Sequence, residues 1–170
     1  HDALPILQNI ALGNYALDAL TSGDDNVAIG LNSLGANTTA SRNTAVGSGA
    51  MQTQTTGNNN TAVGKDALKV STTGAQNVAI GKDSMLTLTT AADNTAVGTQ
   101  SLKLNTTGDS NTALGKQALE ANTTASNNVA VGMEAMLQNT TGGNNTAIGY
   151  GSLENNTTGT SNVAIGRDAL

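Results

Sequence analysis

Short groups of alternating aliphatic and polar residues recur along the chain at a constant spacing. The pentapeptide Asn-(Thr/Val/Ile)-Ala-(Val/Ile/Leu)-Gly begins at Asn9 and then at every seventeenth residue up to Asn162. Its second and fourth residues alternate with the others, which is the period of two expected of a strand with aliphatic side chains on one face. The pattern predicts one short strand in each repeat, with no insertion between residues 9 and 170.

The other positions of the repeat are also nearly fixed, and we number all of them as columns, with the Asn as column 1. Column 5 is always Gly, column 8 is Ala or Ser, column 9 is Leu or Met, and column 13 is Thr. Glycine at column 5 indicates a turn, columns 7 to 11 favour a second short strand, and Asn-Thr-Thr-Gly at columns 12 to 15 favours a second turn. The predicted turn glycines are Gly30, Gly47, Gly64, Gly81, Gly98, Gly115, Gly132 and Gly149.

A 17-residue repeat is too short for the two helices of helical repeat proteins, and its Gly, Thr, Asn and Ser content disfavours a helix. We therefore predict an all-β fold, a parallel β-solenoid (a β-roll or β-helix) of about ten coils. Successive coils would stack about 4.8 Å apart, so that each column becomes a ladder of like residues.

Two kinds of ladder follow from this stacking. Asn at column 1 and Thr at columns 13 and 14 would hydrogen-bond from coil to coil, while columns 4 and 9 would form the apolar core. The predicted Asn ladder comprises Asn26, Asn43, Asn60, Asn77, Asn94, Asn111, Asn128, Asn145 and Asn162. The predicted core comprises Ile29, Val46, Leu68, Ile80, Met85, Leu102, Leu119, Val131, Ile148 and Leu153.

Each coil offers few large apolar residues, which favours an oligomer whose neighbouring chains share a core. Ala at column 3 and Ala or Ser at column 8 would form a small-residue face that lets another chain approach closely. The alternative is a thin solenoid that is stabilised by its ladders alone.

We expect residues 1–170 to form a single repeat domain within a longer fibre protein. Residues 9–170 hold the regular repeats, and residues 1–8 an irregular first coil, because the spacing there is four residues short and includes Pro5.

Composition excludes most chemistry. The chain has no Cys and one His, so we predict no metal site, no cofactor, no catalytic residues and no enzyme activity. Its net charge of −5 argues against nucleic acid as a partner. No apolar stretch is long enough to span a membrane, so we predict no membrane partner. A content of 37% hydrophobic and 11% charged residues favours order over disorder.

Two groups of residues allow a binding role beside a structural one. Carboxylates at column 7 could contact a cation or a glycan, although solvated turns are favoured; they are Asp66, Asp83, Glu134 and Asp168. Tyr15 and Tyr150 could stack on a sugar, although surface decoration or packing between chains is favoured.

The Asn-Val-Ala-Ile-Gly motif at residues 26–30, 77–81 and 162–166 resembles the head repeats of trimeric autotransporter adhesins, whose own repeats are shorter. The longer pattern at residues 145–159 resembles repeats of bacteriophage tail fibres and related bacterial fibres. The resemblance covers essentially the whole chain. It implies a left-handed, homotrimeric β-roll that is extracellular, on a virion tail fibre or a bacterial surface.

The function expected from these features is a non-catalytic structural segment of a fibre, a rigid shaft or head that supports attachment to a host or surface. Another part of the fibre would bind the surface receptor or glycan. One alternative is an ice-binding solenoid with Thr ladders, although same-face Thr pairs are few, as at residues 53–55 and 87–89. The other alternative is a filament subunit that associates end to end.

Overall fold

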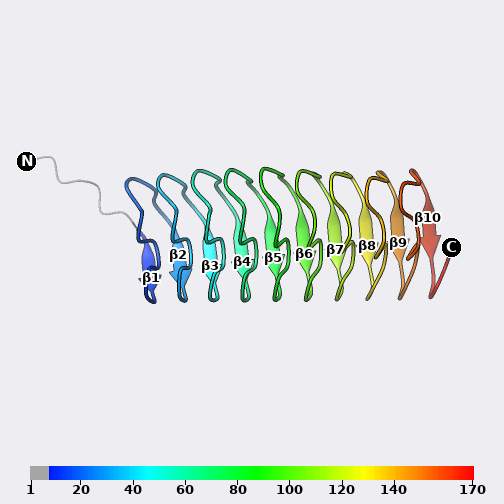
Figure 1. The fold of residues 1–170 in the computed structure, drawn as a ribbon, viewed down its shortest axis with the longest axis horizontal. Coiled ribbons are helices and arrows are strands. Elements are labelled where there is room, and N and C mark those ends of the chain that lie inside the picture. The colour runs from blue at the N-terminus through cyan, green and yellow to red at the C-terminus, as the bar shows by residue number, and fades with distance from the viewer. Residues whose placement is uncertain (1–7) are drawn as a thin grey trace, which may run out of the picture.

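The computed structural model describes residues 8–170, which form an all-β parallel solenoid without any helix in that range (Figure 1). Each coil contains one strand of three residues, and nine full turns separate the first strand from the last. The strands are β1 (Ile10–Leu12), β2 (Val27–Ile29), β3 (Thr44–Val46), β4 (Thr61–Val63), β5 (Val78–Ile80), β6 (Thr95–Val97), β7 (Thr112–Leu114), β8 (Val129–Val131), β9 (Thr146–Ile148) and β10 (Val163–Ile165). The predicted irregular first coil lies outside the described residues, apart from Gln8.

All ten strands belong to one parallel sheet in the order of the sequence. Each residue pairs with the residue of the same column in the next coil; Ala28, for example, lies opposite Ala45. The strands therefore lie side by side along the long axis of the molecule in Figure 1, with a turn at each end of every strand. The predicted strand position, the parallel stacking and the 17-residue period are confirmed.

The side chains of the strands point the opposite way from the prediction: column 3 points into the coil, and columns 2 and 4 point out of it. Ala at column 3 is fully buried in β2 to β9, and the residues on either side of it are half-buried or exposed. Ile80 and Ile148 are 38% and 39% exposed, respectively. Five members of the predicted core therefore have their side chains on the outside of the coil, and that part of the prediction is wrong: Ile29, Val46, Ile80, Val131 and Ile148.

The reason is that the two walls of each coil lie close together. The Ser33 hydroxyl, at column 8, donates a hydrogen bond of 3.0 Å to the carbonyl of Ala45, at column 3 of the next coil. Ser152 and Ala164 repeat this contact at 3.0 Å near the other end. Only a methyl or hydroxymethyl group fits between walls at this separation. The small residues of columns 3 and 8 fill the interior, so the prediction that they contact another chain is wrong.

The large apolar residues of the interior come from column 9, apart from Leu88 at column 12. The column-9 residues are buried from Leu34 to Leu153, in agreement with the prediction for Leu68, Met85, Leu102, Leu119 and Leu153. The predicted second strand at columns 7 to 11 is absent from residues 8–170. Columns 7, 9 and 17 instead have positive φ, which is 48° at Leu102, and this bends the chain around the corners of the coil.

The left-handed backbone explains which residues occupy these columns. Among residues 8–170, none of the non-glycine residues with positive φ is Val, Ile or Thr, although these types are frequent in the strands. A β-branched side chain is strained in that conformation, whereas Leu and Met are unbranched at Cβ. Column 9 is therefore restricted to Leu and Met even though Val and Ile are equally hydrophobic.

Glycine at column 5 has two roles. Its φ is 138° at Gly64, and a Cβ atom there would lie only 2.6 Å from the carbonyl oxygen of Gly81 in the next coil. Positive φ and close approach recur at all eight predicted turn glycines, which confirms that prediction.

The predicted Asn ladder is confirmed along its full length. The Asn111 side chain donates at 3.2 Å to Asn94 Oδ1 and at 2.8 Å to the Ala125 carbonyl, and its Oδ1 accepts the backbone N–H of Asn128 at 3.0 Å. The backbone N–H of every ladder residue from Asn26 to Asn162 bonds to the preceding side chain in this way. Each ladder amide thereby provides hydrogen-bond partners for buried backbone groups that lie outside the sheet.

The Thr columns differ from each other. Column 13 hydroxyls donate to the carbonyl of the same column in the next coil, as Thr106 does to Thr123 at 2.9 Å. Column 14 side chains are exposed, and the hydrogen-bond ladder predicted for them is not formed within residues 8–170.

A second interior ladder lies at column 12, and it is interrupted. Asn105, Asn122, Asn139 and Asn156 are linked by amide hydrogen bonds of 2.9 to 3.1 Å. Four earlier coils carry other residues in this column: Leu20, Gln54, Ser71 and Leu88. Gln54 Oε1 and Ser71 Oγ are buried without a hydrogen-bond partner, which is destabilising.

We expect Leu102→Ile to lower the free energy of unfolding by about 2 to 3 kcal/mol, because a β-branched residue is strained at φ 48° while the side-chain volume is unchanged. Leu102→Met should lower it by about 1 kcal/mol or less, since Met already occupies this column elsewhere. Urea denaturation of the three proteins measures both values, and equal losses would contradict the role of the backbone conformation.

We expect the double substitution Q54N/S71N to raise the free energy of unfolding by about 1 to 3 kcal/mol, because it continues the Asn ladder and removes two unpaired polar atoms. Thr73→Asn, on the exposed surface of the coil that carries Ser71, is the matched control and should change stability by about 0.5 kcal/mol or less. Thermal and urea unfolding measure the difference, and a double variant no more stable than the starting protein would count against the explanation.

Candidate binding surfaces

The outer face of the sheet is the longest apolar surface of the described residues. It consists of columns 2 and 4, where column 2 is Thr, Val or Ile and column 4 is always Val, Ile or Leu. Val97 and Leu114 in the middle of the sheet are each 37% exposed. No charged residue interrupts the two columns, and a contiguous apolar face of this kind is typical of an interaction surface.

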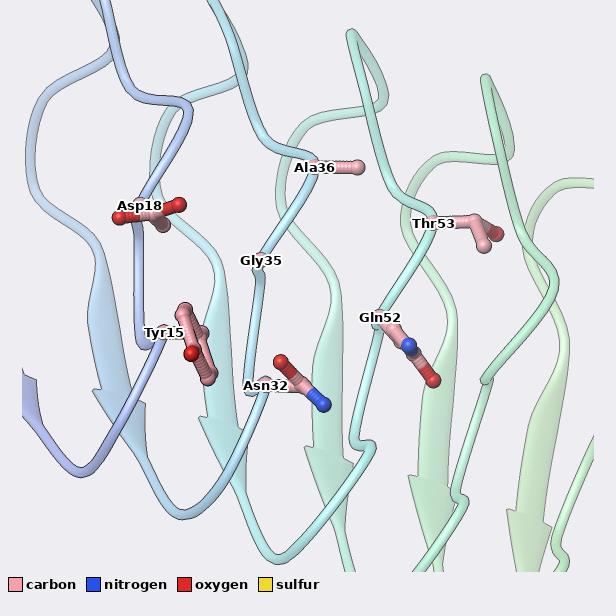
Figure 2. A pocket seen from close by; sticks show the side chains of 7 residues that line it. All are labelled: Tyr15, Asp18, Asn32, Gly35, Ala36, Gln52 and Thr53. Atoms are coloured by element: carbon pink, nitrogen blue, oxygen red, sulfur yellow. The ribbon is translucent and has the colours of Figure 1, made fainter.

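A surface groove of about 270 Å³ crosses the first three coils on the wall opposite the strands (Figure 2). Figure 2 shows the bare backbone of Gly35 between the coil that carries Tyr15 and the coil that carries Gln52. The polar side chains around it are Asp18, Asn32 and Gln52, and Ala36 and Thr53 complete the lining. Sequence reasoning identified Tyr15 but missed the groove, although Gly35 is the one glycine in column 10.

A second groove of about 280 Å³ lies further along the same wall. It is centred on Ala121 and flanked by Leu104 and Leu137. Two of its polar side chains are already paired, because Gln117 donates to Glu120 at 2.7 Å and Lys103 contacts Glu120 at 3.5 Å. This groove has no aromatic residue in its lining.

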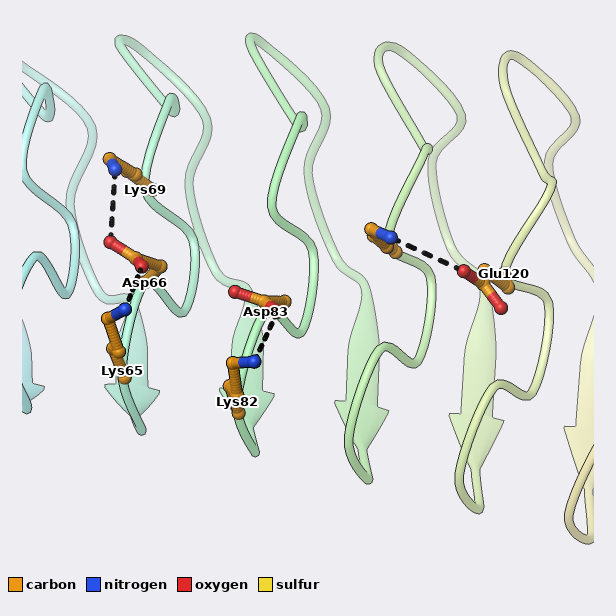
Figure 3. Close-up of polar contacts among 7 residues, drawn as sticks. Lys65, Asp66, Lys69, Lys82, Asp83 and Glu120 are labelled. Atoms are coloured by element: carbon orange, nitrogen blue, oxygen red, sulfur yellow. Dashed lines mark hydrogen bonds and ion pairs between the residues drawn. The ribbon is translucent and has the colours of Figure 1, made fainter.

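Ion pairs lie on the surface in the middle of this wall (Figure 3). Asp66 contacts Lys69 at 3.1 Å and Lys65 at 3.6 Å, and Asp83 contacts Lys82 at 3.5 Å. All three lysines are well exposed to solvent, so these pairs contribute little to stability. The lysines are solvated, but the Asp66 and Asp83 side chains at column 7 are only 17% and 15% exposed, so these two carboxylates are paired and half-buried rather than lying in the solvated turns that the sequence favoured.

Tyr150 lies in a small charged cluster near the C-terminal end. The Arg167 guanidinium lies over its ring, 5.4 Å from the centroid. The pKa of the Tyr150 hydroxyl is raised above its ordinary value, first by a hydrogen bond with the Glu134 side chain and then by the negative charge of Glu134. Glu134 and Asp168, two of the column-7 carboxylates, are thus placed around Tyr150, since Asp168 also pairs with Arg167 at 3.2 Å.

Exposed threonines form a further surface along column 14. Ser22 begins this row, and every later coil that reaches the column has an exposed Thr there: Thr39, Thr56, Thr73, Thr90, Thr107, Thr124, Thr141 and Thr158. The same-face Thr pairs at residues 53–55 and 87–89 do not present free hydroxyls to a ligand. Thr53 and Thr87 donate their hydroxyls to the carbonyls of Lys69 and Lys103 at 3.0 Å.

Within residues 8–170, no cluster of three or more His, Cys, Asp or Glu side chains is arranged to hold a metal ion. The same residues include no helix long and apolar enough to cross a bilayer.

Comparison with protein-family models, with curated proteins and with solved structures finds no match to the chain. The class of the protein is therefore defined by its own geometry, as an all-β parallel solenoid with one apolar sheet face and one polar, grooved wall.

Proposed function

We propose that the chain is a non-catalytic structural segment of an extracellular fibre, either a phage tail fibre or a bacterial surface adhesin. In this role it is a rigid shaft or head that supports attachment to a host or surface, and a receptor or glycan is bound by another part of the fibre. The segment associates with itself as a homotrimer of left-handed coils, as the resemblance of its Asn-x-Ala-(Ile/Val)-Gly motif to fibre repeats implies.

The observation that supports this proposal is the unbroken aliphatic column on the outer face of the sheet. Ten strands spaced about 4.8 Å apart give this face a length of about 45 Å, which is unusual for a surface that stays in water. Burying it against identical faces would remove half-exposed Val, Ile and Leu side chains from solvent along the whole rod. In this proposal the chains contact one another through columns 2 and 4 rather than through the Ala columns, which are interior.

The regular spacing of the coils also favours a symmetric assembly. Because every coil presents the same column at the same position, parallel copies around a common axis match like residues along their entire length. Such closed symmetry limits the assembly to a defined number of chains. A trimer would also carry three copies of any terminal binding domain, which strengthens weak attachment through multivalency.

The regular ladders suit a mechanical role. The coils from Asn9 to Leu170 contain no insertion, and each is joined to its neighbours by backbone, Asn and Thr hydrogen bonds. A rod of this kind has few long, exposed loops at which it could bend or be cleaved.

We expect the full chain to have a concentration-independent native mass of three times 16.9 kDa by light scattering. Val97→Lys, in the middle of the outer sheet face, should convert it to monomers because it buries an unpaired charge. Thr107→Lys, on the exposed column 14, is the matched control and should leave the mass unchanged. A stable monomer of the unsubstituted chain would refute the trimer, as would equal masses for the two variants.

A mass that rises with concentration would instead support end-to-end association. The last coil leaves an open hollow lined by Leu153, Asn155, Asn156, Asn162 and Leu170, where a further coil could stack. Growth that persists in Val97→Lys would assign the association to the ends of the solenoid rather than to the outer sheet face.

Ice binding is a second candidate, and the exposed row of column 14 is the observation that favours it. From Thr39 to Thr158 the row repeats one hydroxyl and one methyl group in each coil at a fixed spacing, but it is a single row, because column 13 hydroxyls are bonded to carbonyls. We expect no thermal hysteresis at micromolar protein. Activity that is lost on substituting Thr90 and Thr107 by Lys would favour ice binding over the fibre role.

A further inference from the structure

The groove around Gly35 owes its shape to two small residues in adjacent columns. Other coils carry Asp, Gln, Lys, Leu or Glu at column 10, whereas the second coil has Gly35, followed by Ala36 at column 11. The missing side chains open a hollow between the flanking coils, which are two coil spacings apart, or about 10 Å. Its volume of about 270 Å³ suits a ligand the size of one sugar ring rather than a drug-sized molecule.

The lining combines an aromatic ring with hydrogen-bonding groups of both kinds. Tyr15 is 63% exposed, and Figure 2 shows its ring beside Asn32 on the outside of the coil. Asn32 and Gln52 each offer a donor and an acceptor, and Asp18 offers two acceptor oxygens. An aromatic face packs against the C–H face of a pyranose ring, while amides and carboxylates bond to its hydroxyl groups.

The polar groups of this groove are also available to a ligand. Within residues 8–170, the side chains of Tyr15, Asp18, Asn32 and Gln52 make no hydrogen bond or ion pair with the protein. The groove around Ala121 has the same place on its coil, but Gln117, Glu120 and Lys103 there are bonded to one another. Only the first groove therefore presents unused donors and acceptors beside an aromatic ring.

We propose that the groove around Gly35 binds one neutral pyranose unit of a glycan. The Tyr15 ring packs on the apolar face of the sugar, and Asp18, Asn32 and Gln52 bond to its hydroxyls. The only charged group in the lining is the Asp18 carboxylate, so an acidic sugar is repelled. This assigns a binding role to the segment itself, beyond its structural role in a fibre.

The groove and the outer sheet face do not overlap. The strands pass behind the groove in Figure 2, and the lining residues belong to columns 7, 10 and 11, whereas the outer sheet face belongs to columns 2 and 4. A trimer formed through the sheet would leave one groove open on each chain. Sugar binding can therefore succeed or fail independently of the oligomeric state.

Saturation-transfer NMR on the full chain tests the proposal, with the methyl glycosides of glucose, galactose, mannose and N-acetylglucosamine as probes. We expect at least one of them to bind, with the strongest transfer to ring protons on a single face. N-acetylneuraminic acid is the acidic comparison and should bind at least about tenfold more weakly. Absence of binding by all four neutral probes overturns the proposal, and so does equal binding of the acidic sugar.

Three variants locate the site. Tyr15→Gln removes the ring, using a residue that column 7 already carries in Gln100 and Gln117, and Gly35→Leu fills the groove as Leu86 and Leu137 fill column 10. Each should weaken binding by about tenfold or more. Tyr150→Gln, at the other exposed tyrosine, should leave it unchanged. Wild-type affinity in a folded Tyr15→Gln protein overturns the proposal even where Gly35→Leu fails to fold.

Discussion

The narrow separation between the two walls of each coil constrains the rest of the structure. With the column-8 hydroxyl of Ser33 only 3.0 Å from the column-3 carbonyl of Ala45, the strand can turn nothing larger than Ala toward the interior. The larger aliphatic residues of the same strand must then face outward. The interior is completed by Leu or Met at column 9 and by two columns of amides, so much of its cohesion comes from hydrogen bonds rather than from apolar volume.

This kind of interior makes each coil dependent on its neighbours. The buried amide of Asn111 bonds to Asn94 in the preceding coil, and its oxygen accepts a hydrogen bond from Asn128 in the following coil. The left-handed residues at columns 7, 9 and 17 add strain that a coil on its own has few contacts to offset. Stability is therefore gained mainly at the interfaces between coils, as in other linear repeat proteins, and a single coil is not an independent folding unit.

The sequence was sufficient for the period, the parallel stacking and the hydrogen-bonded columns 1 and 13, because in-register stacking leaves a clear trace in residue types. It wrongly added column 14 and did not identify the Asn ladder at column 12. It was insufficient to predict which face of each strand lies in the interior of the coil. Alternation specifies two faces but does not say which one is interior, and assuming that Ile80 is more buried than Ala79 reverses every side chain of the strand.

Two other features left weaker traces in the sequence. The left-handed conformation at column 9 leaves only the absence of Val and Ile as a sign, and that sign is easily taken for a preference in packing. The groove around Gly35 depends on one coil differing from the others, and an argument from what the repeats share overlooks such an exception.

That exception has a wider consequence for how such a rod can change. Columns 10 and 11 accept Gly, Ala, Leu, Lys, Glu and Gln on the same backbone, so the fold places little restriction on the wall that carries the groove. A substitution in one coil alters the surface at one height along the rod, in steps of about 4.8 Å. Adding or removing whole coils would shift such a feature along the axis without altering its shape. The solenoid thus separates the position of a surface feature from its chemistry, and the two can evolve independently.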